Sequence, residues 1–208
     1  YCPYHEQALA IAVDAYARLK GIGVGFVTSG PGATNLITGV GCSYYDSIPV
    51  IFFSGQVGQF HITGKRKVRQ RGFQESDVVS LFKPITKFAY QIKKADEIDY
   101  ILDKAYYLAK SGRPGPVLID LPFNIQKTII DTRRLKKFKP NQIKYNDRSK
   151  IYRLVDLLNS SKRPLFIAGG GIRLADQVKN FLHLVNKKKI PFITTWAAQD
   201  IINTNHKL

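Results

Sequence analysis

The stretch that decides the fold is GVGFVTSGPGATN, residues 23–35. Its first part, residues 23–28, is a short apolar run with the length of a buried strand. The following Ser29-Gly30-Pro31-Gly32 predicts a tight turn, because glycine adopts backbone conformations that other residues avoid. Apolar residues at helical spacing from residue 33 to residue 45 then predict a helix. A strand, a glycine-rich turn and a helix in this order indicate a βα unit.

The same alternation extends along the first 126 residues. Helices are predicted over residues 5–19 and 97–110, and strands over residues 49–54 and 116–121. The two strands are apolar without alternation, as expected of parallel strands that are covered on both faces. The sequence therefore predicts an α/β fold in which a parallel sheet with right-handed crossovers is flanked by helices.

A polar, basic stretch separates this region from a second one. Residues 127–150 lack apolar periodicity and are predicted to be a basic linker. A second, Rossmann-like α/β domain begins at residue 151, with predicted helices over 151–159 and 178–188 and strands over 164–168 and 191–195. It ends at residue 208, before a sheet of ordinary size is complete. We expect a domain over residues 1–126 that is truncated at its N-terminus, the linker over 127–150, and a truncated domain over 151–208.

Charge and composition narrow the classes of function. The net charge is +17, with nine basic residues against two acidic ones in the linker and five more basic residues within residues 65–71. Neither cluster carries a nucleic-acid-binding motif, so a solvated linker and loop is favoured over nucleic-acid binding, and an anionic ligand stays open. No apolar run reaches the length of a membrane span. Cys2 and Cys42 fit free thiols, and the N-terminus does not resemble a signal peptide, so a cytoplasmic location is expected.

The residues that could carry chemistry have two readings each. The glycine-rich turn would let the backbone approach a ligand, but it is also a common structural connection, and it matches neither a dinucleotide fingerprint nor a Walker loop. Glu6, beside His5, begins the first predicted helix, where a carboxylate commonly complements the helix dipole. No further cluster of ligands accompanies the two, so no metal site is predicted.

Taken together, these segments resemble a known family, the thiamine diphosphate-dependent acetolactate synthases. The similarity covers most of their pyrimidine-binding domain and the start of their central domain. The matching motifs, in the family's order, are His5-Glu6-Gln7-Ala8, SGPGATN at residues 29–35, Asp46-Ser47-Ile48-Pro49, Ser54-Gly55-Gln56-Val57, Phe73-Gln74-Glu75, Pro84-Ile85-Thr86-Lys87, Gly112-Arg113-Pro114-Gly115-Pro116, Ala168-Gly169-Gly170-Gly171 and Thr194-Thr195-Trp196.

The resemblance implies an enzyme of the transferase or lyase kind. Members decarboxylate a 2-oxo acid such as pyruvate and condense the product with a second carbonyl compound, in branched-chain amino-acid biosynthesis. The cofactor supplies the electron sink, and the protein supplies orientation and electrostatics. Magnesium would be bound through a C-terminal domain that this sequence lacks, so the chain alone is expected to be inactive. The expected partners are further copies in a dimer or tetramer and a small regulatory subunit.

Individual residues take roles by the same resemblance. Glu6 would be the catalytic carboxyl group that hydrogen-bonds N1′ of the aminopyrimidine, with a pKa raised by an apolar site. Pro31 and Asn35 would border the aminopyrimidine ring. Phe73 and Gln74 would face the reacting substrate.

Other matches point to a second cofactor. Arg113, Gly169, Gly170 and Gly171 match positions that contact FAD in acetolactate synthases, where the flavin is largely structural. Alternatives stay open here: Arg113 also fits a residue that braces a turn, and the three glycines also fit a plain connection from strand to helix.

Departures from the family concern the substrate. The usual lysine after the strand at residues 116–121 is here Phe123, and the loop over residues 60–72 is longer and far more basic. These changes leave open a related enzyme that acts on another 2-oxo acid or a sugar-derived substrate, and a non-catalytic remnant. We hypothesise that the basic loop favours a substrate more anionic than pyruvate.

Overall fold

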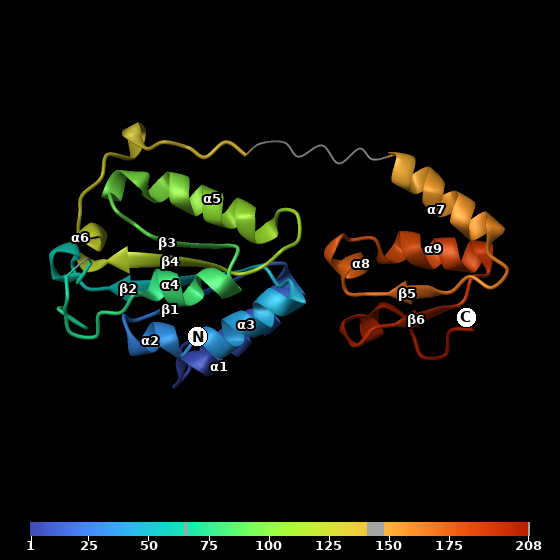
Figure 1. Ribbon diagram of the computed structural model, residues 1–208, viewed down its shortest axis with the longest axis horizontal. Helices are drawn as coiled ribbons and strands as arrows, with labels where there is room; N and C mark the ends of the chain where they lie inside the picture. Colours follow the sequence, from blue (N-terminus) through green and yellow to red (C-terminus); the bar gives the residue numbers. More distant parts are fainter. Residues whose placement is uncertain (65, 141–147, 208) are drawn as a thin grey trace. The chain divides into compact units, whose positions relative to one another are not determined.

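The structure, a computed structural model, describes residues 1–64, 66–140 and 148–207. The chain forms two compact units, Tyr1–Asn141 and Gln142–Leu208 (Figure 1). Lys65 of the basic loop and residues 141–147 of the predicted linker lie outside the described residues.

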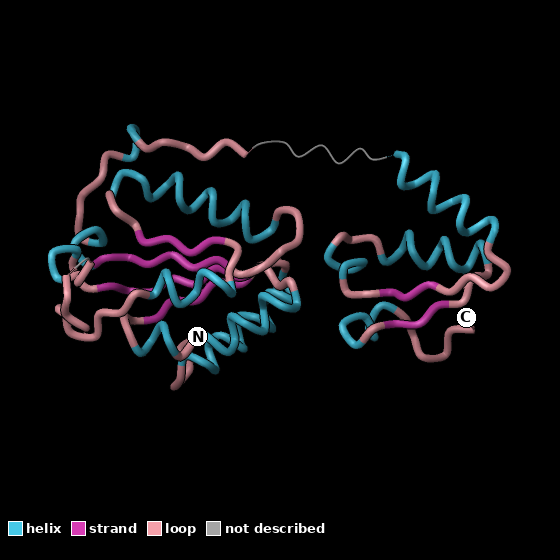
Figure 2. Tube along the Cα trace, viewed as in Figure 1, coloured by secondary structure: helices cyan, strands magenta, loops and turns pink. Residues whose placement is uncertain are grey.

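The first unit contains a four-stranded parallel sheet in the order β1-β2-β4-β3. Its strands are β1 (Gly23–Val27), β2 (Val50–Gln56), β3 (Phe88–Gln91) and β4 (Val117–Pro122). The three apolar runs in the sequence became β1, β2 and β4, which confirms the predicted parallel sheet. Figure 2 shows these strands between two layers of helices.

Helices cover both faces of the sheet (Figure 1). On one face lie α1 (Glu6–Lys20), α3 (Ile37–Asp46) and α4 (Val78–Phe82), and on the other lies α5 (Ile98–Lys110). Successive residues of the central strands alternate between the two cores, with Phe52 and Leu118 in one and Ile51, Val117 and Ile119 in the other. Burial on both faces explains why the strands read as continuous apolar runs.

Helix ends follow from local chemistry. His5 caps α1, because its Nδ1 atom accepts a hydrogen bond from the backbone N–H of Gln7 at 3.1 Å. At the other end Gly21 adopts the left-handed conformation, with φ of 84°, that glycine allows at little cost. The predicted helix over residues 5–19 is therefore confirmed within one residue at each end.

Elsewhere in this unit the sequence-based prediction was wrong or incomplete. The helix predicted over residues 33–45 is interrupted, because α2 (Pro31–Thr34) ends before α3 begins at Ile37. Neither α4 nor β3 was predicted, since both are too short to show a period. The remaining short elements are η1 (Gln59–His61), η2 (Lys83–Ile85), η3 (Ala95–Glu97), α6 (Phe123–Gln126) and η4 (Thr132–Arg134).

The second unit is smaller. Two parallel strands, β5 (Phe166–Ala168) and β6 (Phe192–Thr194), form its sheet. Its helices are α7 (Arg148–Ser160), α8 (Gly171–Leu174), α9 (Val178–Lys188) and η5 (Trp196–Ile201). The α/β pattern agrees with the prediction, but only six of its described apolar residues are buried, and none of them lies in α7.

Two further sequence observations have structural counterparts. Cys2 and Cys42 are both exposed free thiols. Within the described ranges, every helix is too short or too polar to cross a membrane.

Candidate functional site

With the exception of Arg113, the predicted site residues of the first unit gather beyond the C-terminal ends of β1 and β2. Glu6 is the first residue of α1, and Asn35 lies in the interruption between α2 and α3. The side-chain amide of Asn35 donates a hydrogen bond from Nδ2 to Glu6 Oε2 at 2.9 Å. Asn35 keeps right-handed helical backbone angles, φ of −66° and ψ of −16°, and its amide reaches across to the start of α1. The pair joins the two motifs HEQA and SGPGATN in space.

The expectation of a raised pKa for Glu6 is wrong for this chain. The pKa is lowered, chiefly by the hydrogen bond from Asn35, then by a backbone hydrogen bond and the neighbouring His5. Desolvation acts in the opposite direction but is weak here, since the carboxyl group is only partly buried. The chain by itself does not supply the apolar surroundings that the sequence-based argument assumed.

The glycine-rich turn contacts the segment that carries Phe73 and Gln74. Gly30 has a φ of +56°, and a Cβ added to it would lie 2.2 Å from the carbonyl oxygen of Gln74. Gln74 itself has a φ of +60°, an unusual conformation for a residue with a side chain. Phe73 is 85% exposed and projects from this segment. Glycine at position 30 is therefore required both by its conformation and by this close approach.

A buried carboxylate lies beneath this edge of the sheet. Asp120 in β4 is fully buried and stands beside Ser54 of β2 and Gln91 of β3 in the strand register. Ser54 Oγ, Gln56 Nε2 and Gln91 Nε2 donate to its carboxylate at 2.6, 3.1 and 2.8 Å. Desolvation raises the pKa of Asp120, and the three hydrogen bonds partly oppose that rise.

The same network reaches the exposed segment. Gln56 Nε2 also donates to the backbone carbonyl of Ser76 at 3.0 Å, so the buried network fixes the chain two residues after Gln74. Sequence reasoning missed Asp120, although an aspartate inside the apolar run VLIDLP is the signal that could have found it, because a carboxylate is rarely buried without partners.

Glu75 organises the basic loop from inside. Its carboxylate accepts hydrogen bonds from the backbone and hydroxyl of Thr63 and from the backbone N–H groups of Arg71 and Gly72. Burial alone would raise the pKa of Glu75, but these hydrogen bonds outweigh it and lower the pKa. The loop is therefore folded around one carboxylate, a role that the sequence motif did not reveal.

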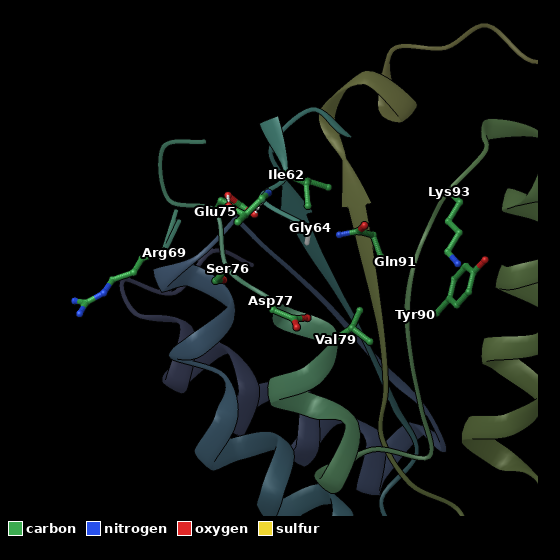
Figure 3. Close-up of a pocket in the computed structure, with 11 residues that line it drawn as sticks. Ile62, Gly64, Arg69, Glu75, Ser76, Asp77, Val79, Tyr90, Gln91 and Lys93 are labelled. Carbon is green, nitrogen blue, oxygen red and sulfur yellow. Dashed lines mark hydrogen bonds between the residues drawn. The ribbon is translucent and has the colours of Figure 1, made fainter. Parts of the chain in front are cut away.

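A hollow of about 500 Å³ lies between the loop and β3 (Figure 3). Its polar side chains mostly have partners within the protein: Glu75 holds the loop, Gln91 bonds Asp120, and Tyr90 bonds Glu97. Arg69 points away from the other lining side chains (Figure 3). This hollow is consequently a space between structural elements whose polar side chains are engaged within the protein.

Two smaller depressions flank Phe73. One, about 330 Å³, adjoins Gly30 and Pro31, and the other, about 470 Å³, adjoins Ser29, Arg71 and Phe123. Within the described residues there is no group of three or more His, Cys, Asp or Glu side chains that could hold a metal ion. The Glu6–Asn35 pair and the open space around Phe73 are the candidate features of this edge.

Comparison with known proteins agrees with this arrangement. Residues 1–81 match the family model of the thiamine pyrophosphate enzyme, N-terminal TPP binding domain, and residues 151–208 match that of the central domain. The chain belongs to the thiamine pyrophosphate enzymes. Both Glu6 and Asn35 lie within the matched N-terminal domain.

Several acetolactate synthases are similar along the whole chain. The large subunit from Lactococcus lactis subsp. lactis (strain IL1403) is 40% identical over an alignment of 210 residues, which covers 98% of this chain and 35% of that protein. The probable large subunit from Methanococcus aeolicus is 40% identical over 213 residues, covering 98% and 34%. The acetolactate synthase from Arthrospira platensis is 35% identical over 214 residues, covering 100% and 36%. The chain thus spans about a third of the length of these curated relatives.

Arg113 lies at the opposite edge of the sheet of this thiamine pyrophosphate enzyme. It precedes β4, and its Nε atom donates to Ser47 Oγ at 2.7 Å, while Nη2 donates to the carbonyl of Tyr45 at 3.4 Å. Ser47 has a positive φ of 62° at the end of α3. Arg113 therefore braces a turn, as one of the two sequence-based readings had it, and it is not near Glu6.

The three glycines lie in the second unit, where β5 leads into α8. A Cβ on Gly170 would lie 3.0 Å from the carbonyl oxygen of Ala197, so this glycine permits a close packing contact. Gly171 has open space around its Cα, and Gly169 has only Thr195 Oγ1 nearby, at 3.9 Å. In this thiamine pyrophosphate enzyme the middle glycine is thus explained by packing, while the outer two leave room at the turn.

Proposed function

We propose that the chain is part of a thiamine diphosphate-dependent carboligase that resembles acetolactate synthase and acts on 2-oxo acids. The observation that carries this proposal is the Glu6–Asn35 pair beside the glycine-rich turn, in the domain type that binds thiamine pyrophosphate in its family. The names of the similar proteins support the choice of reaction.

The residues around Glu6 fit the aminopyrimidine part of the cofactor. A Cβ on Gly32 would lie 3.5 Å from Glu6 Oε1 and 2.8 Å from Thr28 Cγ2, so glycine keeps the space beside that oxygen clear. Asn35, at the C-terminal end of α2, bonds the other carboxyl oxygen of Glu6, and by the resemblance Pro31 would border the same ring. A flat heterocycle with a basic ring nitrogen could thus meet the carboxyl group without a change in the backbone.

Each residue then has a defined task. Thiamine diphosphate, when bound, supplies the nucleophilic carbon and the electron sink. Glu6 holds and transfers a proton at its carboxyl oxygen, and Asn35 fixes the orientation of that carboxyl group. Because the hydrogen bond from Asn35 lowers the pKa of Glu6, covering of the site by the cofactor and other protein segments must raise it for proton exchange near neutral pH. Phe73 and Gln74 would face the substrate.

Further features of the function are proposals of the same kind. They are magnesium bound by residues elsewhere in the full-length protein, FAD near Gly169, Gly170, Gly171 and Arg113, assembly as a homo-oligomer with a regulatory subunit, and a cytoplasmic location. For Arg113 a flavin would have to be accommodated together with the hydrogen bonds to Ser47 and Tyr45.

The test is product analysis with the full-length protein. It would be incubated with thiamine diphosphate, magnesium and pyruvate, and the release of carbon dioxide and the formation of acetolactate would be measured separately. Both products are expected. Release of carbon dioxide without acetolactate would indicate a decarboxylase instead of a carboligase. The absence of both products with every 2-oxo acid tried would refute the proposal.

A further inference from the structure

The depression of about 470 Å³ beside Phe73 differs in chemistry from the two other hollows. Its lining includes the basic side chains of His61 and Arg71 and the aromatic rings of Phe73 and Phe123, but no carboxylate. The two other hollows both include Glu75, and the largest one also includes Asp77. Its volume lies within the range of about 300–1,000 Å³ that small-molecule sites occupy.

Lys127 adds a second cationic group next to Phe123, which lines this depression. The Nζ atom of Lys127 lies 4.3 Å from the centre of the Phe123 ring, in a cation–π contact. Phe123 is 53% exposed, so its ring and the ammonium group stay accessible from solvent. Cationic side chains therefore approach the depression from two segments, the basic loop and the residue after α6, and η1 adds the imidazole of His61.

Arg71 is held in position without being neutralised. Its Nη1 atom donates to the backbone carbonyl of Phe60, and its own backbone N–H is bonded to Glu75. Among the ion pairs of the described residues, none involves the Arg71 guanidinium. A guanidinium that is fixed at one nitrogen and unpaired with a carboxylate is suited to bind an anion with its remaining N–H groups.

The depression also adjoins the proposed reaction site. Phe73 forms a wall shared with the hollow that contains Gly30, Pro31 and Gln74, and Ser29 lines the depression itself. A substrate whose carbonyl group faces Phe73 and Gln74 could thus extend toward Arg71 over a short path.

We propose that this depression binds a second anionic group of the acceptor substrate, a phosphate or a carboxylate, through Arg71 with His61 and Lys127 nearby. The identification of the ligand as the acceptor substrate rests on the proposed function. The binding of an anion in the depression does not. The acceptor would be an aldehyde or 2-oxo compound that carries the anion a few atoms from its carbonyl carbon. Local contact, and not the general field of the basic loop, provides the selectivity.

Arg69 is a matched control within the same loop. It lies two residues from Arg71 and carries the same charge. Its side chain lines the neighbouring hollow, where it points away from the other lining side chains (Figure 3), and it does not line the depression. If the loop merely attracts anions through its field, loss of either arginine has the same effect. If the depression is a binding site, Arg71 matters and Arg69 does not.

The first measurement is binding to the 208-residue chain by nuclear magnetic resonance. Glycerol 3-phosphate and succinate serve as anionic probes, with glycerol and 1,4-butanediol as neutral counterparts. The Nε–Hε signal of Arg71 and the amide signals of Phe73 and Phe123 should shift with at least one anionic probe. Arg71→Gln should weaken binding at least tenfold, Arg71→Lys should retain part of it, and Arg69→Gln should leave it within twofold.

The second measurement is carboligation by the full-length protein with pyruvate as donor. Glyceraldehyde 3-phosphate is compared with glyceraldehyde, and succinic semialdehyde with butanal. The ratio of kcat/KM for the charged over the neutral member should fall at least tenfold in Arg71→Gln and stay within twofold in Arg69→Gln. A fall in the first pair alone assigns the depression to phosphate, a fall in the second alone to carboxylate, and a fall in both to either anion.

The outcomes separate the inference from the proposed function. Equal binding of the anionic probes by wild type, Arg71→Gln and Arg69→Gln, or no shift at Arg71 with either probe, overturns the inference whether or not acetolactate is formed. Absence of any carboligation product overturns the proposed function, while the binding measurement still decides the anion site. Melting curves for all variants show whether a loss reflects unfolding, and Arg71→Lys then provides the decisive comparison.

Discussion

In the four-stranded sheet, the edge formed by the N-terminal ends of the strands and the edge formed by their C-terminal ends have different roles. At the N-terminal edge, polar groups close turns: Arg113 bonds Ser47, and the Lys87 ammonium donates to the carbonyl of Ser111 at 2.6 Å near the end of α5. At the C-terminal edge, Glu6 and Asn35 bond each other at the surface, and Phe73 projects into solvent.

The difference indicates which side chains contribute to the stability of the fold and which contribute to activity. Side chains at the N-terminal edge bind parts of the same unit, so their loss should lower the free energy of unfolding. At the C-terminal edge Phe73 and Asn35 are exposed, and the buried Asp120 network holds the segment after Gln74 from beneath. Substitutions on that surface should change activity and leave the fold intact, whereas substitutions in the network should affect both.

The largest expected effect is at Glu6. Glu6→Gln in the full-length protein should lower kcat about 1,000-fold, because the amide cannot transfer the proton that the carboxyl group handles. The melting temperature should stay within about 2 °C, because Gln still accepts the hydrogen bond from Asn35. Asp96→Asn, at another exposed carboxylate near a helix start, is the control and should keep wild-type turnover. A Glu6→Gln enzyme with turnover close to wild type would remove Glu6 from the mechanism.

Next in size is the buried network. Asp120→Ala should destabilise the 208-residue chain by about 3 kcal/mol, because it leaves Ser54, Gln56 and Gln91 without their common acceptor. Asp120→Asn should cost under about 1 kcal/mol, since it keeps the shape, one acceptor and a donor for the Ser54 hydroxyl while removing a buried charge. Urea unfolding measures both. Equal losses in the two variants would show that the charge, and not the hydrogen bonding, is what the site requires.

A smaller, pH-dependent effect is expected at Glu75. Its pKa in the folded chain is below the ordinary value of 4.5, so its contribution to stability is present above that pH and is lost as the pH falls below it. Glu75→Gln should therefore cost about 1–2 kcal/mol at pH 7 and almost nothing near pH 3, because the neutral acid also lacks the charge. Unfolding of both chains across this range measures the difference. A constant difference between pH 7 and pH 3 would contradict the assignment.

The smallest effect belongs to the N-terminal edge. Arg113→Ala should lower the free energy of unfolding by about 1 kcal/mol, through the lost hydrogen bonds to Ser47 and Tyr45. Arg113→Lys should recover only part of this, because one ammonium does not reproduce the two-sided geometry. If Arg113→Ala were as stable as wild type, the two edges would not differ in the way described.

Much of the fold could be predicted from the sequence because its strands are buried on both faces. Continuous apolar runs identified β1, β2 and β4, whereas β3 (Phe88–Gln91) was missed because it is four residues long and only half-buried. The helix over residues 33–45 was predicted as one element because the apolar spacing continues through Asn35 and Leu36. The interruption lies in the hydrogen bonds, because both residues keep helical backbone angles while the Leu36 N–H donates to the carbonyl of Ala33, three residues back.

The site was predicted less completely than the fold. Glu6 and Asn35 are 29 residues apart in sequence, and they were assigned by resemblance before the structure brought them together. Asp120 and Glu75 were missed because their roles depend on strand register and on the path of a long loop, neither of which local patterns specify. The pKa of Glu6 was predicted in the wrong direction because exposure of a side chain depends on what covers it.

The close approach of Gly30 to the Gln74 carbonyl has a thermodynamic consequence. The two backbones are in contact, so the turn cannot shift toward the segment unless the segment moves with it. A ligand that immobilises the turn therefore reduces the conformational entropy that a second ligand must remove when it orders the segment with Phe73 and Gln74. Such linkage is reciprocal. If the first ligand multiplies the affinity for the second by some factor, the second multiplies the affinity for the first by the same factor.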